Sequence, residues 1–66
     1  MQPLISIITP CYNAVPFIAQ TIESVLTQTY PYWEMLIVDD CSTDRSAEII
    51  QTYVKRDLRI KYFRTE

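Results

Sequence analysis

Apolar and polar residues follow a pattern along the 66-residue chain that favours strands and helices in turn. A β-branched apolar run at residues 4–9 ends at Pro10 and predicts a buried strand. A second apolar run at 33–38 and an alternating apolar and basic stretch at 58–62 predict two more strands. Apolar residues at helical spacing predict two amphipathic helices between them. Their expected inward faces are Ile18, Ile22, Val25 and Leu26, and Ala47, Ile50 and Val54 with Ile49 and Tyr53 alongside.

This order of elements predicts an α/β fold, β-α-β-α-β, with a parallel sheet and crossover helices. Asn13 is a good N-cap for the first helix, with Pro16 in its first turn, and Ser42, Thr43 or Asp44 is expected to cap the second. With strand order 3-2-1 and right-handed crossovers, both helices lie on one face of the sheet. Because the first two strands are apolar on both faces, we expect something outside this segment, either the rest of a larger domain or a partner, to cover the other face.

Composition excludes several classes of site. The chain has no glycine, so it contains no Gly-rich phosphate loop. It has no histidine, which removes His-based triads and the commonest zinc ligand. The net charge of −2 does not indicate nucleic-acid binding. All six Lys and Arg residues fall within 45–66, a distribution more typical of a solvated helix end and strand than of a phosphate- or lipid-binding edge.

The chain shows no features of a secreted or membrane-spanning protein. No signal peptide is visible, and no apolar stretch approaches the ~20 residues that a membrane span needs. We therefore expect a cytoplasmic protein, either free or at the inner face of the membrane. Cys11 and Cys41 follow adjacent predicted strands and could approach each other, but in a reducing cytoplasm we expect free thiols.

Two predicted loops, at residues 10–13 and 39–44, follow the first two strands. They lie at the edge where open α/β sheets bind ligands. Tyr12 offers an aromatic plane for a base, and Asp40 offers a carboxylate that can accept from a ring N–H or from ribose hydroxyls. The N-termini of the helices that follow favour anions such as a pyrophosphate. Together these features predict a nucleotide site that does without a glycine loop.

Each of these side chains also has a structural interpretation. Asn13 and Asp44 favour helix capping over ligand binding. Asp39 either accepts N–H bonds within its loop or binds a ligand, with neither alternative favoured. Asp40 favours a ligand role, because two adjacent carboxylates repel each other and need a cation or donors. Tyr12 either stacks on a base or is only an aromatic residue at the rim.

Three segments resemble, in this order and spacing, the start of family 2 glycosyltransferases with the GT-A fold: residues 5–13 (ISIITPCYN), 22–30 (IESVLTQTY) and 36–44 (LIVDDCSTD). The resemblance covers nearly the whole chain and implies that residues 1–66 are the Rossmann-like N-terminal portion of a single nucleotide-sugar-binding domain. It implies that Pro10 and Tyr12 line the base pocket, that Asp40 binds the base or ribose, and that Asp39 is a neighbouring structural or binding carboxylate. The family often has Gly at the position of Cys41, which matters only if that residue needs a positive φ.

The resemblance implies an inverting glycosyltransferase. Its donor would be a nucleotide-sugar, most often a UDP-sugar, and its acceptor a glycan, a lipid or another molecule, as in polysaccharide biosynthesis. The family's Asp-x-Asp motif for Mg²⁺ or Mn²⁺, and its catalytic base, lie downstream and have no counterpart in these residues. We therefore assign no catalytic or metal-binding residue here and expect no transfer activity from this segment alone. Peripheral membrane association and oligomer formation stay open.

Two other functions are alternatives to this one. A receiver-type signalling domain has its carboxylate pair after the first strand and a phosphorylated Asp after the third. Here the pair follows the second strand, and the third ends without Asp, so this function is disfavoured. The remaining alternative is a non-catalytic α/β interaction module that pairs its open sheet face with a partner chain.

Overall fold

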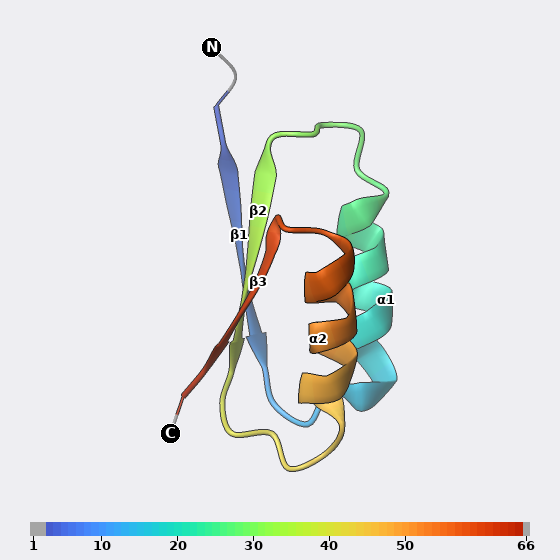
Figure 1. The fold of residues 1–66 in the computed structure, drawn as a ribbon, viewed down its shortest axis with the longest axis vertical. Helices are drawn as coiled ribbons and strands as arrows, with labels where there is room; N and C mark the ends of the chain where they lie inside the picture. The colour runs from blue at the N-terminus through green and yellow to red at the C-terminus, as the bar shows by residue number, and fades with distance from the viewer. Residues whose placement is uncertain (1–2, 66) are drawn as a thin grey trace.

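Residues 3–65 are described by a computed structural model, in which two helices lie on one face of a three-stranded parallel sheet (Figure 1). The strands are β1 (Ile5–Cys11), β2 (Trp33–Asp39) and β3 (Ile60–Arg64). Helix α1 (Val15–Leu26) connects the first two strands, and α2 (Ser46–Arg56) connects the last two. The strand order is β1-β2-β3, with both neighbouring pairs parallel. The predicted fold class, element order and placement of both helices on one face are confirmed.

The core lies between β2 and the two helices. Every second residue of β2 from Trp33 to Asp39 is buried, as expected for a central strand covered on one side. On α1 the predicted inward residues Ile18, Ile22 and Val25 are buried, and Leu26 is half-buried. Neither helix in the described part of the chain has the length and apolar composition that a membrane crossing requires.

The inward face of α2 differs slightly from the prediction. Ile50 is fully buried, but Ala47 and Val54 are only half-buried. Tyr53 is buried in their place, and its hydroxyl donates to Glu23 Oε2 on α1 at 2.8 Å. This hydrogen bond raises the pKa of Tyr53, and burial adds to the shift. Tyr53 therefore joins the two helices to each other as well as to the sheet.

β1 continues to Cys11, two residues past the predicted end of the strand at Thr9. Pro10 lies inside the strand, opposite Val38, although the sequence suggested a loop there. Proline has no N–H to donate, but β1 is an edge strand and needs hydrogen bonds on only one side. β2 likewise runs one residue further than predicted, to Asp39. The loop that carries Tyr12 is therefore shorter than expected.

β3 begins at Ile60, so Leu58 is not a strand residue as the alternation suggested. The N–H of Ile60 donates to the Asp57 carbonyl at 3.1 Å, and the N–H of Arg59 donates to Asp57 Oδ1 at 3.0 Å. These bonds form a tight turn before the strand. The turn leaves Leu58 at its tip, 86% exposed.

The sheet face opposite the helices is apolar near the carboxyl ends of the strands and polar near the amino ends. Its large apolar side chains are Ile8, Leu36, Val38 and Phe63, of which Ile8 and Phe63 are 63% and 51% exposed. At the polar end Glu34 accepts a hydrogen bond from Ser6 Oγ at 2.8 Å and lies 3.8 Å from Lys61 Nζ. We call this surface the open face. The expectation that the rest of a larger domain or a partner covers the open face stays a prediction.

Candidate functional site

The carboxyl ends of the parallel strands meet at one edge of the sheet, where the loops after β1 and β2 lie side by side (Figure 1). The N–H of Asp40 donates to the Cys11 carbonyl at 2.8 Å, and the N–H of Thr65 donates to the Asp39 carbonyl at 2.9 Å. These two bonds continue the strand pairing beyond the last residues of the sheet. We call residues 12–14 the first loop and residues 40–45 the second loop.

Asp39 lies inside the protein, with none of its surface exposed. Its Oδ1 accepts from the N–H of Ser42 at 2.9 Å and from the Ser42 hydroxyl at 2.5 Å, and its Oδ2 accepts from the Tyr62 hydroxyl at 2.6 Å. Burial opposes ionisation, but these hydrogen bonds and the nearby Arg64 outweigh it and lower the pKa of Asp39 below its usual 3.8. Both oxygens are engaged by the protein, the arrangement expected of a structural carboxylate.

Asn13 joins the two loops. Its Oδ1 accepts from the N–H of Thr43 at 2.8 Å and from the N–H of Asp44 at 3.3 Å, and its own N–H donates to Ser42 Oγ at 2.9 Å. Its φ of 45° lies in the left-handed region, which Asn tolerates better than most residues. The prediction that Asn13 caps α1 is wrong, because its side chain bonds to the second loop. The N-cap is Ala14, which makes no side-chain cap bond.

Asp44 binds the starts of both helices. Its Oδ2 accepts from the N–H of Val15 at 3.3 Å, and its Oδ1 accepts from the N–H and hydroxyl of Ser46 at 2.9 and 2.6 Å. The bond from the Ser46 hydroxyl is the main cause that lowers the pKa of Asp44. The N-cap of α2 is Arg45, so the prediction that one of residues 42–44 is that cap is wrong. Because a carboxylate already lies at both helix starts, we do not expect a pyrophosphate there.

Tyr12 and Asp40 keep their side chains at the surface of this edge. Tyr12 is 62% exposed, and Asp40 is also exposed. Asp40 Oδ1 accepts from the Thr65 hydroxyl at 2.9 Å, whereas no donor within residues 3–65 bonds to its Oδ2. Pro10, the fourth predicted binding residue, is exposed in the adjoining edge strand. Asp40 therefore has a carboxylate oxygen with which to accept a bond from a ligand.

The two cysteines are free thiols in different surroundings. Cys11 is buried, with its Sγ 3.9 Å from Ser42 Oγ. Cys41 is half-buried and donates its thiol hydrogen to the Thr65 carbonyl at 2.8 Å. Its φ is 56°, so this position does adopt the conformation for which glycine is best suited.

No metal centre can be built from the residues that the structure describes. Residues 3–65 contain no group of three or more His, Cys, Asp or Glu side chains that could hold a metal ion. Asp39 uses both of its oxygens within the protein, which leaves Asp40 as the exposed carboxylate of the adjacent pair. One carboxylate is too few for a divalent cation that prefers several oxygen ligands. The described residues alone therefore do not supply a binding site for such a cation.

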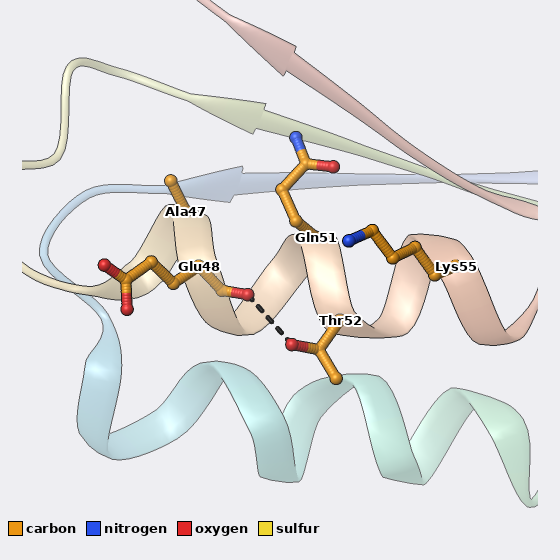
Figure 2. A pocket seen from close by; sticks show the side chains of 5 residues that line it. All are labelled: Ala47, Glu48, Gln51, Thr52 and Lys55. Atoms are coloured by element: carbon orange, nitrogen blue, oxygen red, sulfur yellow. Dashed lines mark hydrogen bonds between the residues drawn. The ribbon is translucent and has the colours of Figure 1, made fainter.

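A shallow hollow lies elsewhere, along α2 (Figure 2). Its lining residues are Ala47, Glu48, Gln51, Thr52 and Lys55. The hydroxyl of Thr52 donates to the carbonyl of Glu48 at 3.1 Å, within the helix itself. None of the four predicted binding residues contributes to this hollow. The carboxyl edge is the better candidate site, because Tyr12 and Asp40 lie there in two different loops, together with Asp39 at the end of β2. The hollow is lined only by side chains on the outer face of one helix.

Several known proteins with similar sequences are named as glycosyltransferases, and two of them are named for teichuronic or colanic acid biosynthesis. Residues 6–66 match the sequence model of Glycosyl transferase family 2. TuaG of Bacillus subtilis (strain 168), a glycosyltransferase named for teichuronic acid biosynthesis, is 58% identical over 59 residues, which cover 89% of this chain and 23% of TuaG. WcaA of Escherichia coli (strain K12), named for colanic acid biosynthesis, is 48% identical over 67 residues, which cover 98% of this chain and 23% of WcaA.

Solved structures agree with this assignment. TarS 1-349 of S. aureus in complex with UDP-GlcNAc superimposes with a TM-score of 0.86 at 33% identity, over 98% of this chain and 19% of TarS. The mannosyltransferase PcManGT of Pyrobaculum calidifontis, in complex with GDP-Man and Mn²⁺, gives a TM-score of 0.81 at 25% identity, over 100% of this chain and 20% of PcManGT. The chain spans about a fifth of the length of these proteins. The resemblance seen in its three motifs is confirmed, and the chain belongs to glycosyl transferase family 2.

Proposed function

We propose that this chain is the N-terminal part of a GT-A domain and contributes the nucleotide-binding residues of an enzyme that uses a nucleotide-sugar donor, in particular a UDP-sugar. One observation carries the proposal. Asp40 is an exposed carboxylate with an oxygen available to a ligand, whereas its neighbour Asp39 is fully buried and bonded. The donor class is supported by the relatives, because the TarS structure contains UDP-GlcNAc and the PcManGT structure contains GDP-Man.

Recognition in this proposal divides between two side chains. Asp40 accepts hydrogen bonds from a ring N–H of the base or from the ribose hydroxyls, which are donors that a carboxylate can bind strongly. Tyr12, on the neighbouring first loop, stacks its ring on the base, and Pro10 lines the same pocket. Asp39 acts indirectly, because its bonds to Ser42 and Tyr62 hold the second loop in place.

The remainder of the reaction would depend on residues outside this segment. The proposed enzyme inverts the configuration at the sugar carbon by direct displacement, with a base that deprotonates the acceptor hydroxyl. A divalent cation on the leaving diphosphate, Mg²⁺ or Mn²⁺, would need ligands that residues 3–65 do not supply. TuaG and WcaA are named for polysaccharide synthesis, which supports a sugar or lipid-linked acceptor and gives no support to a nucleic-acid partner.

Calorimetry on the complete gene product, meaning the protein as its gene encodes it, tests the proposal. UDP is titrated into the unmodified protein and into Asp40→Asn. We expect Asp40→Asn to weaken UDP binding about 10- to 100-fold, since a hydrogen bond to a charged group is lost. Glu48→Gln is the matched control, because it removes one carboxylate charge from exposed α2 and should leave UDP affinity unchanged. Equal UDP affinity in the unmodified protein and Asp40→Asn contradicts the proposal.

The open face favours a second candidate, the non-catalytic module that pairs with another chain. Its apolar residues Ile8 and Phe63 need a cover in either case. Family membership favours a cover from the same domain, since this chain spans only about a fifth of its relatives. Unfolding of the complete gene product at several protein concentrations separates the two. A midpoint that rises with concentration supports the module, and a constant midpoint supports the single glycosyltransferase domain.

A further inference from the structure

We infer that Thr65 is a positioning residue of the nucleotide site, whose hydroxyl holds the Asp40 carboxylate in the orientation that binds the donor. This inference rests on the proposed function and extends it to a residue that no motif of the sequence indicated. Thr65 follows β3, whereas Asp40 follows β2, so the two meet only because these strands are paired.

Thr65 makes hydrogen bonds to three consecutive residues of the other strand end. Its N–H donates to the Asp39 carbonyl at 2.9 Å, and its carbonyl accepts the thiol hydrogen of Cys41 at 2.8 Å. Its hydroxyl donates to Asp40 Oδ1 at 2.9 Å and lies 3.3 Å from the Asp39 carbonyl oxygen. The backbone of Thr65 is therefore held on both sides of the hydroxyl. The hydroxyl has a defined position from which to hold Asp40.

An exposed aspartate would otherwise be free to rotate about two side-chain bonds. A hydrogen bond to Oδ1 restricts both rotations and leaves Oδ2 of Asp40 to accept from the nucleotide. The threonine side chain suits this task because its branched Cβ limits its own rotation. Ordering a binding group before the ligand arrives lowers the entropy lost on binding. Since the hydroxyl is neutral, it does this without cancelling the charge that Asp40 offers the ligand.

Variants of the complete gene product test the role, with UDP as the probe in calorimetry. Thr65→Val removes the hydroxyl and keeps the shape, and we expect it to weaken UDP binding about three- to tenfold, the range of one neutral hydrogen bond. Thr65→Ser retains the hydroxyl, so its affinity for UDP should lie within about twofold of that of the unmodified protein. Thr52→Val, which deletes a hydroxyl on exposed α2, should leave affinity unchanged. The double variant Asp40→Ala/Thr65→Val should bind no more weakly than Asp40→Ala alone, because alanine offers the Thr65 hydroxyl no acceptor.

The outcomes separate this inference from the proposed function. If Asp40→Asn binds UDP as well as the unmodified protein does, the proposed function fails. If Asp40→Asn weakens binding but Thr65→Val does not, only the positioning role is overturned. It is also overturned if Thr65→Val weakens binding equally with and without the Asp40 carboxylate, because Thr65 would then act by another route. Should Thr65→Val unfold the protein, Thr65→Ala replaces it in the same comparisons.

Discussion

Charged side chains lie at both ends of the parallel sheet, so the Asp57–Arg59 pair at the amino end can be compared with the Asp39–Asp40 pair at the carboxyl end. At the amino end, Arg59 Nη2 lies 2.7 Å from Asp57 Oδ2, its guanidinium carbon lies 3.9 Å from the centre of the Trp33 ring, and Nη1 donates to the Pro31 carbonyl at 2.9 Å. At the carboxyl end, Asp39 is fully buried with both of its oxygens bonded within the protein, but Asp40 stays at the surface.

The comparison shows how a binding group can be told from a structural one. At the amino end the Asp57 carboxylate and the Arg59 guanidinium are paired with each other, and the guanidinium lies over the Trp33 ring. At the carboxyl end the enclosed carboxylate, Asp39, organises the loop that presents the exposed one, Asp40. A charged residue at a strand end thus indicates a ligand site when the fold leaves one of its hydrogen-bonding positions open.

The largest expected effect comes from the enclosed carboxylate at the carboxyl end. Asp39→Ala leaves the Ser42 N–H and the Ser42 and Tyr62 hydroxyls without their acceptor, and we expect it to cost about 2–4 kcal/mol of unfolding free energy. Asp40→Ala removes one exposed hydrogen bond and should cost less than about 1 kcal/mol. Urea unfolding of the complete gene product measures both values. Equal losses would remove the distinction between the two carboxylates.

Acid should destabilise the fold through the carboxylates whose pKa is lowered by hydrogen bonds in the folded state. The pKa of Asp39 is lowered below 3.8 in the folded state, so between the folded and unfolded pKa values the unfolded chain binds more protons. The stability that Asp39 contributes is therefore present above its unfolded pKa and is lost as the pH falls through the folded value. The pKa of Asp57 at the amino end is lowered in the same direction, chiefly by its hydrogen bond from Arg59.

Unfolding midpoints measured over about pH 2–6 check this expectation. We expect the unfolding midpoint of the unmodified protein to decrease as the pH is lowered below about 4. In Asp39→Asn and in Asp57→Asn this decrease should be smaller. Asp40→Asn is the comparison variant and carries the same change of charge on the exposed carboxylate. If the unfolding midpoints of Asp39→Asn and Asp57→Asn depend on pH as steeply as that of the unmodified protein, neither carboxylate controls acid unfolding.

Arg59 tests the amino end alone. Arg59→Gln removes the ion pair with Asp57 and the charge over Trp33, so the thermal midpoint should fall. UDP affinity should stay within about twofold, because the cluster lies at the opposite end of the sheet from Asp40. Thermal unfolding and UDP calorimetry measure the two effects. Arg59→Gln should lower stability and keep UDP affinity, whereas Asp40→Asn should lower UDP affinity. A large loss of UDP affinity in Arg59→Gln would mean that the two ends are not independent.

Periodicity predicted the helices and strands because burial repeats locally. Ile18 and Ile22 lie one helical turn apart, and that spacing was enough to place them in the core. The alternation of buried residues along β2 could also have distinguished Asp39 from Asp40, but the sequence interpretation did not use it in this way. Trp33, Met35 and Ile37 are buried at every second position, so continued alternation turns Asp39 inward and Asp40 outward.

Contacts between the loops could not be predicted in this way. Asn is a residue type that often caps helices, yet the amide oxygen of Asn13 accepts hydrogen bonds from the N–H groups of residues 43 and 44 in the second loop. A local sequence pattern cannot show that Asn13 bonds to a loop 30 residues away instead of to the helix that follows it. Thr65 was missed for a similar reason, because its bond to Asp40 depends on the register between β2 and β3. Local signals thus predicted the elements, and tertiary pairing decided the site.

The smallest expected effect belongs to Cys41, whose φ of 56° costs a residue with a Cβ about 1–2 kcal/mol. Cys41→Gly removes this cost but also loses the thiol bond to the Thr65 carbonyl and adds freedom to the unfolded chain. We expect a net change within about 1 kcal/mol, measured by urea unfolding. Cys41→Val keeps the steric cost, adds a branched Cβ and loses the thiol, so it should be clearly less stable than Cys41→Gly. Equal stability of the two variants would mean that backbone strain does not govern this turn.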